Sequence, residues 1–226
     1  MNSTTGQSFR VRALLFDMDG TLVNSIAVVE RTWSRFAKRH GLDVNRVLAA
    51  CHGRRTSETV AEFAPPGVSI AEETARIDAE ELADFDGIVE VPGAARLLGS
   101  LPADRWAMVT SADRNLATRR MAAAGLSLPP VTITAEDVIS GKPAPDGYLA
   151  AARALGVSAA ECLVFEDAPA GLRAGEAAGA KVVAVATTLG EGDLVGRHWV
   201  RNFTAVRIGV VADGLFEVGL APISGL

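Results

Sequence analysis

Cysteine is scarce in this chain of 226 residues, which contains only Cys51 and Cys162. Two thiols so far apart in sequence argue against a disulfide framework and against a zinc site, and they fit a reducing compartment. Long apolar runs are missing as well, because no stretch approaches the ~20 residues that a membrane-spanning helix needs. Residues 1–8 are polar and do not resemble the core of a signal peptide. We therefore expect a cytoplasmic protein that does not contact membranes.

An excess of positive charge is also missing. Lysine and arginine number 22 against 27 aspartates and glutamates, which gives a net charge of -5 and a pI of about 5.3. Such a chain has no general attraction for nucleic acid or anionic lipid, so any anion must bind at a local site. The length suits one large domain or two modest ones with a sizeable core.

The chain is organised around residues 11–22, an apolar run that ends in Asp17 and Asp19. A buried apolar segment predicts an interior strand of a parallel sheet, and ligands bind beyond the carboxyl ends of such strands. Side chains two residues apart point to the same side, so the two carboxylates can converge and would repel without a cation or a shared proton. Magnesium is a cation that favours such oxygen ligands. The alternative is a simple hairpin turn at Asp19-Gly20.

The spacing of apolar residues divides the rest of the chain into two parts. Residues 25–88 show helical spacing, which predicts helices around 26–40, 44–50, 56–63 and 70–85. Beyond Pro92-Gly93, strands and helices alternate. We expect strands over 106–110, 131–134, 162–165 and 182–186, and helices over 94–101, 113–124, 145–155 and 168–178. The tail predicts a hairpin of residues 206–211 and 215–218.

Alternating strands and helices predict an α/β fold, a doubly wound, Rossmann-like parallel sheet covered by helices on both faces. The helical stretch separates the first strand from the others, so we interpret it as a small all-helical cap domain inserted after that strand. We assign residues 1–24 and 89–226 to the core and residues 25–88 to the cap. The hinges fall near residues 24–25 and 90–93, and the cap is a candidate lid.

Polar side chains follow the core strands where the strands end. Ser111 follows the second strand, Lys142 the third, and Glu166 and Asp167 the fourth. Each has an ordinary explanation: Ser111 as a helix cap, Lys142 as solvated surface, and either acid as the cap of the next helix. Together with the two aspartates of the first strand, however, they make the set that metal-assisted phosphoryl transfer through an aspartyl intermediate requires.

Four motifs resemble those of the haloacid-dehalogenase (HAD) superfamily, in the branch with a helical cap after the first motif. They are residues 16–22 (FDMDGTL), 109–111 (VTS), 141–146 (GKPAPD) and 164–171 (VFEDAPAG), in the family's order. Within that superfamily, residues 31–33 (RTW), the loop 52–56 (HGRRT) and the long fourth motif are similar to sugar-phosphate phosphatases. That group includes 2-deoxyglucose-6-phosphate and glycerol phosphatases.

The resemblance implies roles for the motif residues. Asp17 would be the nucleophile that becomes the phosphoaspartate, and Asp19 would act as general acid and then as general base. The residues implied for Mg2+ are Asp17, Asp19 through its backbone carbonyl, Glu166 and Asp167. The residues implied for the phosphate oxygens are Ser111, Lys142, Ala112 through its backbone, and Asn115. In the cap loop, His52, Arg54 and Arg55 would meet hydroxyls or a second charge of the substrate, unless that loop is merely solvated.

These expectations favour a Mg2+-dependent phosphatase that hydrolyses a small sugar phosphate or polyol phosphate through a phosphoaspartate. Two alternatives stay open. A phosphoglucomutase-type phosphotransferase would share all four motifs, and a phospho-accepting signalling switch would also combine acids, a hydroxyl and a lysine. We expect a small phosphorylated molecule as the partner, with neither nucleic acid nor membrane, and a monomer or weak homodimer.

Overall fold

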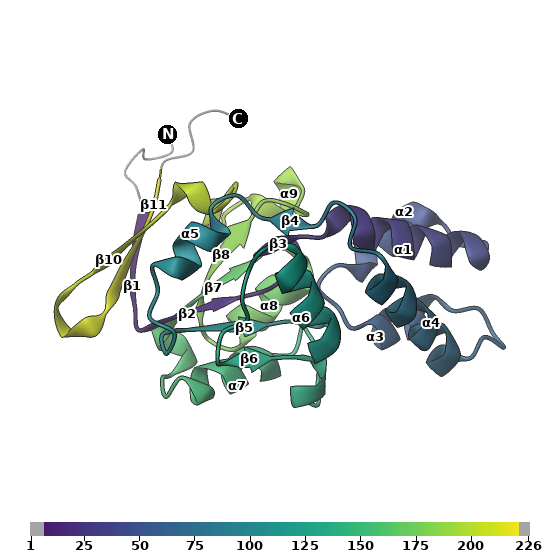
Figure 1. The fold of residues 1–226 in the computed structure, drawn as a ribbon, viewed down its shortest axis with the longest axis horizontal. Coiled ribbons are helices and arrows are strands. Elements are labelled where there is room, and N and C mark those ends of the chain that lie inside the picture. The colour runs from purple at the N-terminus through teal and green to yellow at the C-terminus, as the bar shows by residue number, and fades with distance from the viewer. Residues whose placement is uncertain (1–6, 222–226) are drawn as a thin grey trace.

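The computed structural model describes residues 7–221, and its centre is a six-stranded parallel sheet (Figure 1). In spatial order the strands are β6 (Thr132–Ile133), β5 (Trp106–Val109), β2 (Ala13–Phe16), β7 (Cys162–Glu166), β8 (Lys181–Val185) and β9 (Trp199–Val200). The predicted α/β fold is confirmed. β2 lies between β5 and β7 and runs parallel to both, so the alternative of a hairpin turn after Asp19 is wrong.

The side chains of β2 alternate between two apolar layers. Leu14 and Phe16 pack in one cluster with helices α5 (Ala94–Gly99) and α6 (Arg114–Ala123). Ala13 and Leu15 pack in the other with α7 (Asp146–Ala154) and α8 (Pro169–Ala177). A strand buried on both faces has to be apolar throughout, which explains why β2 carries no polar residue.

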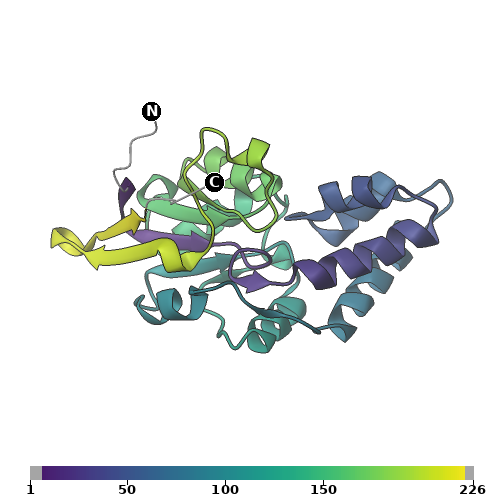
Figure 2. The same ribbon diagram turned by 90° about the horizontal axis from the view of Figure 1, so that it is seen from above.

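Four helices are inserted between the short strands β3 (Val23–Asn24) and β4 (Val89–Glu90). They are α1 (Ile26–Arg39), α2 (Val44–Cys51), α3 (Thr56–Phe63) and α4 (Ile70–Ala83), close to the predicted bounds. Asp43 and Ser69 cap α2 and α4 by accepting hydrogen bonds from backbone N–H groups of the first turn. The helices enclose an apolar cluster of their own and stand beyond one end of the sheet (Figures 1 and 2).

The two chain crossings between core and cap pair with each other. β3 and β4 form a two-stranded antiparallel ribbon in which Val23 faces Glu90 and Asn24 faces Val89. This ribbon lies where the sequence predicts the hinges. Because only two short segments connect the helices to the sheet, the position of the cap depends on contacts across its interface with the core.

A separate three-stranded antiparallel sheet projects from the end of the molecule opposite the cap (Figures 1 and 2). It contains β1 (Gln7–Val11), β11 (Phe216–Leu220) and β10 (Val206–Val210), with β11 in the middle. The predicted terminal hairpin is confirmed, whereas β1 was not predicted. Within the described residues, no helix is long and apolar enough to cross a membrane.

Candidate active site

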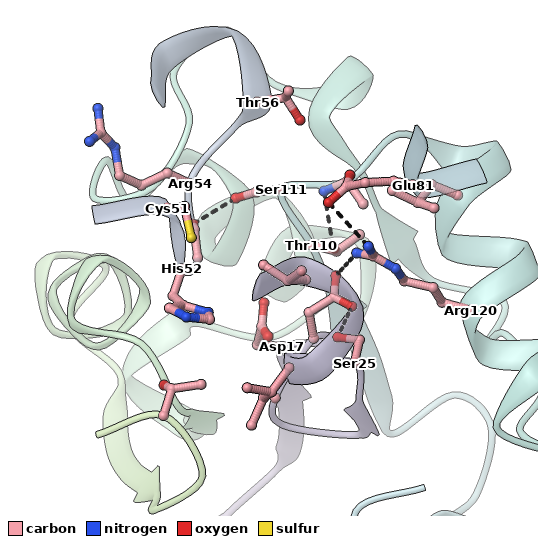
Figure 3. Close-up of a pocket in the computed structure, with 18 of the residues that line it drawn as sticks. Asp17, Ser25, Cys51, His52, Arg54, Thr56, Glu81, Thr110, Ser111 and Arg120 are labelled. Atoms are coloured by element: carbon pink, nitrogen blue, oxygen red, sulfur yellow. Dashed lines mark hydrogen bonds and ion pairs between the residues drawn. The ribbon is translucent and has the colours of Figure 1, made fainter. Parts of the chain in front are cut away.

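Three core strands end level with one another at the edge of the sheet nearest the cap. Phe16 of β2 pairs with Met108 of β5 and with Phe165 of β7. The residues that follow therefore reach the same region, a cavity with about 590 Å3 of empty space, counting the part open to solvent (Figure 3). Its polar lining includes Asp17, Asp19, Ser25, His52, Glu81, Thr110, Ser111 and Arg120.

Three buried carboxylates converge beside this cavity, and Asp17 is the one that lines it. Asp17, Glu166 and Asp167 each place a carboxylate oxygen within 4.8 Å of the others. The ammonium of Lys142, itself buried, donates to Asp17, to Glu166 Oε1 at 2.6 Å and to the carbonyl of Val109 at 3.2 Å. One lysine balances only one of the three negative charges, and buried unpaired charge is unfavourable. The set therefore fits a hard divalent cation with oxygen ligands.

The pKa values of these groups reflect the same excess of negative charge. Burial raises the pKa of Asp17 to about 8, although the charge of Lys142 opposes the shift. Burial, together with the charges of Asp17 and Glu166, also raises the pKa of Asp167. Burial lowers the pKa of Lys142, but the charges of Asp17 and Glu166 raise it by more. The net shift is upward, so this lysine stays charged. A divalent cation at the site would favour the ionised carboxylates.

Glu166 is fixed by contacts on both of its oxygens. Oε2 accepts the backbone N–H groups of Asp167 at 2.9 Å and Ala168 at 3.1 Å, at the start of α8. Oε1 accepts the hydroxyl of Tyr148 at 3.0 Å in addition to the lysine. A Cβ at Gly171 would overlap the Glu166 carboxylate, so only glycine leaves room for it there.

Asp167 is held by two threonine hydroxyls. Thr21 donates to Oδ1 at 3.1 Å and Thr188 to Oδ2 at 2.8 Å. Gly20 lies against the same carboxylate with φ of +79°, and a Cβ at this position would overlap Asp167. The Asp-Gly pair of the first motif thus provides a tight turn and a close approach to the third carboxylate.

The carboxylate of Asp19 lies outside this cluster. Its Oδ1 accepts the hydroxyl of Ser25 at 2.6 Å, and its Oδ2 pairs with Arg120 Nη1 at 2.9 Å (Figure 3). The other end of the Arg120 guanidinium pairs with Glu81 of the cap at 3.2 Å. Neither Arg120 nor Glu81 was predicted from the sequence.

The predicted phosphate-binding residues take different positions. Ser111 lines the cavity and donates to the carbonyl of Gly53 at 2.9 Å, while Asp113 is the residue that caps α6. Ala112 also lines the cavity. Asn115 is exposed on α6 and does not line it. In this structure the hydroxyl of Ser111 is therefore engaged by the cap loop.

Two residues of the cap loop lie at the cavity but face it differently. His52 lines it, and burial lowers the pKa of its imidazole, which is thus neutral at pH 7. Arg54 contributes to the lining, but its guanidinium pairs with Glu62 at 2.6 Å and points away from Asp17 (Figure 3).

Arg55 joins the cap to the core. Its guanidinium donates to three backbone carbonyls of the loop that leads to Lys142, namely those of Ala135 at 3.0 Å, Val138 at 2.7 Å and Ile139 at 2.9 Å. It does not line the cavity that contains Asp17. A side chain with these partners anchors the loop that carries His52.

Fold and site together define the class: the chain belongs to the haloacid dehalogenase-like hydrolases, whose family model matches residues 11–179. It is similar to hexitol phosphatase A of Escherichia coli, with 45% identity over 78% of this chain and 83% of that protein. It is also similar to glycerol-1-phosphate phosphohydrolase 2 of Saccharomyces cerevisiae, with 36% identity over 92% and 88% of the two chains. A solved hydrolase from Pseudomonas syringae matches with a TM-score of 0.73 and 26% identity over 83% of this chain and 92% of that chain. The resemblance to sugar-phosphate phosphatases is confirmed.

Proposed function

We propose that this protein is a Mg2+-dependent phosphatase that hydrolyses the monophosphate of a small sugar or polyol through a phosphoaspartate at Asp17. The observation that carries the proposal is the buried group of three carboxylates and one lysine beneath a cap-covered cavity. The similarity to hexitol and glycerol-1-phosphate phosphatases supports this substrate class.

The first half-reaction transfers the phosphoryl group to the enzyme. A carboxylate oxygen of Asp17 attacks phosphorus while the bond to the leaving oxygen breaks, and Asp19 donates its proton to that oxygen. Lys142 and the Ser111 hydroxyl hold phosphate oxygens. Mg2+, when bound by Asp17, Asp167, Glu166 and the backbone carbonyl of Asp19, supplies positive charge that offsets the charge of the phosphate.

The second half-reaction releases the product. Asp19, now ionised, takes a proton from a water molecule, which attacks the phosphorus of the phosphoaspartate. The bond between phosphorus and the Asp17 oxygen breaks, inorganic phosphate leaves, and Asp17 returns as a carboxylate. One catalytic residue thus serves as acid and then as base, and protons balance over the cycle.

The cavity favours a neutral leaving group over one that bears a second phosphate. Two arginines near the cavity are held by other groups, Arg55 by backbone carbonyls and Arg120 by two carboxylates. The guanidinium of Arg54 pairs with Glu62 and points away from Asp17 (Figure 3). The remaining cap-side lining includes Ile26, Val29, Trp33, Cys51 and the neutral His52. A bisphosphate would need a free cation, so this lining favours a phosphatase over a phosphoglucomutase-type enzyme.

Phosphate release from a panel of hexitol, hexose, deoxysugar and glycerol phosphates tests the proposal. We expect release that depends on Mg2+, stops with a chelator and is abolished in Asp17→Asn, with monophosphates of uncharged sugars and polyols preferred to bisphosphates. Formation of an isomerised sugar phosphate would indicate the mutase instead. A stable phosphoenzyme without turnover would indicate the signalling switch.

A further inference from the structure

A buried arginine connects the acid/base residue to the cap. Arg120 lies in the last turn of α6, a core helix, and is only 2% exposed. It pairs with Asp19 on one side and with Glu81 of α4 on the other, so a continuous line of charged groups runs from the catalytic loop into the cap (Figure 3). Glu81 is also buried, and it has no other ion pair among the described residues.

The two ends of this connection are not equivalent. The contact of Arg120 Nη1 with Asp19 is a directed hydrogen bond of 2.9 Å. The contact of Nη2 with Glu81, at 3.2 Å, lacks hydrogen-bond geometry, and Nε has no hydrogen-bond partner within residues 7–221. The link to Asp19 is thus the stronger one, and the link to the cap is the one that can loosen when the cap moves.

A guanidinium in this position suits the control of orientation. The Asp19 carboxylate has to reach the leaving oxygen and then a water molecule, and small displacements of a catalytic group can cost about 100-fold in rate. Ser25 and Arg120 each hold one oxygen of this carboxylate, which fixes the plane of the group. Removal of a partner from a buried ion pair leaves a charge uncompensated, so Glu81 and Arg120 favour the closed arrangement together.

We propose that Arg120 is the positioning residue for the Asp19 carboxylate, and that its ion pair with Glu81 completes this positioning only when the cap is closed. The inference rests on the proposed phosphatase function and adds to it a link between cap closure and proton transfer. Arg120 itself does not take part in bond making.

The test uses two substrates that differ in their need for an acid. The leaving group of a polyol phosphate is an alkoxide, which needs the proton of Asp19. The leaving group of p-nitrophenyl phosphate is a stable phenolate, which does not. The value of kcat/KM reports steps up to phosphorylation of Asp17 and so isolates the acid role from the later base role. In Arg120→Met we expect kcat/KM to fall by about 100-fold for the polyol phosphate and far less for the aryl phosphate.

A second signature follows from the base role. Because Arg120→Met still accepts the phosphoryl group from the aryl phosphate but hydrolyses it slowly, we expect a burst of nitrophenol stoichiometric with enzyme. Arg120→Lys, which keeps the positive charge, should show the same selectivity with smaller losses and decides the matter if Arg120→Met does not fold. Glu81→Gln should also lower kcat/KM more for the polyol phosphate than for the aryl phosphate, with the smallest difference of the three variants.

Arg153→Met is the control, because Arg153 is exposed on the core helix α7, away from the cap, and should leave both substrates unaffected. Equal losses of kcat/KM for the two substrates in the folded Arg120 variants would overturn the inference and leave the phosphatase function standing. No selectivity in Glu81→Gln would overturn the role of the cap. A wild-type protein that hydrolyses neither substrate would overturn the proposed function and the inference together.

Discussion

Gly171 shows how a residue without a functional group can determine the chemistry of the site. Its hydrogen occupies the space where any Cβ would overlap the Glu166 carboxylate. Glu166 in turn is held by Lys142, by Tyr148 and by two backbone N–H groups at the start of α8. Displacement of this one carboxylate would therefore disturb the lysine that also pairs with Asp17.

Gly171→Ala should reduce kcat by about 100-fold or more, because Glu166 and Lys142 must both move while every functional group is retained. Gly175→Ala on the same helix is the control, since its Cβ would meet a Val182 methyl group at 3.0 Å, away from the carboxylates. That control should lower stability by about 1–3 kcal/mol with little change in kcat. Steady-state kinetics and urea unfolding are measured for both variants. Equal kcat values for Gly171→Ala and Gly175→Ala would show that Glu166 tolerates displacement.

The residues at the ends of strands could be predicted, and those on helix faces could not. Asp17, Glu166 and Asp167 stand at the ends of the buried strands β2 and β7, and parallel strands deliver such residues to a common edge. Lys142 reaches the same edge from the loop after β6. The position of Arg120 depends on how α6 is rotated against the sheet, and that of Glu81 on how the cap is docked. Both are set by tertiary packing.

At the scale of elements, the cap loop between α2 and α3 is anchored by one of its two arginines. Arg55 donates to three carbonyls of the loop before Lys142, whereas Arg54 forms an ion pair with Glu62 inside the cap. Only the first contact crosses from cap to core. The loop that offers His52 to the cavity is thus fastened to the loop that delivers the lysine.

Arg55→Met should raise KM by about 10-fold or more for both a polyol phosphate and an aryl phosphate, since it removes charged hydrogen bonds that hold the cap closed. Arg54→Met should change KM little, because partly exposed ion pairs contribute about 0–1 kcal/mol. The KM values of both variants for both substrates check this. A rise in KM for the polyol phosphate alone would instead place Arg55 in contact with the substrate.

Most element bounds followed from apolar spacing, and the failures have physical causes. The run that starts at Val11 is divided, because Val11 ends β1 while Ala13 begins β2. β1 became a strand only through pairing with β11, which lies more than 200 residues later in the chain. β9, the short strand Trp199–Val200, likewise exists through its pairing with β8. Spacing alone carries no information on such long-range partners.

At the scale of the whole molecule, the apolar interior is divided between core and cap. The cap cluster, which contains Cys51, has far fewer buried side chains than the cluster beneath the sheet to which Phe16 belongs. Cys162 lies in the other core cluster. Small apolar clusters contribute less stability, so the cap is expected to open before the core does.

The two cysteines can report this order of unfolding. Burial raises the pKa of Cys51 to about 12 and that of Cys162 to about 11, so both should resist alkylation in the native protein. In a urea titration we expect Cys51 to react with iodoacetamide at lower urea than Cys162. The variants Cys51→Ala and Cys162→Ala each leave a single reporter. Reaction of both thiols at one urea concentration would mean that cap and core unfold as one unit.

Cytoplasmic location, a monomeric or weakly dimeric state and the lack of nucleic-acid binding stay predictions from composition. The boundaries between core and cap, placed between residues 24 and 25 and between residues 88 and 89, stay a prediction as well.

The central claim is that phosphate passes through Asp17, and acid-quenched labelling tests it most directly. Asp19→Asn, incubated with p-nitrophenyl phosphate and Mg2+, should accumulate the phosphoenzyme because its hydrolysis lacks a base. Peptide mapping should then find a hydroxylamine-labile phosphoryl group on Asp17. Phosphate release by the wild-type protein with no label on Asp17 in the variant, or with the label on another residue, would contradict the account.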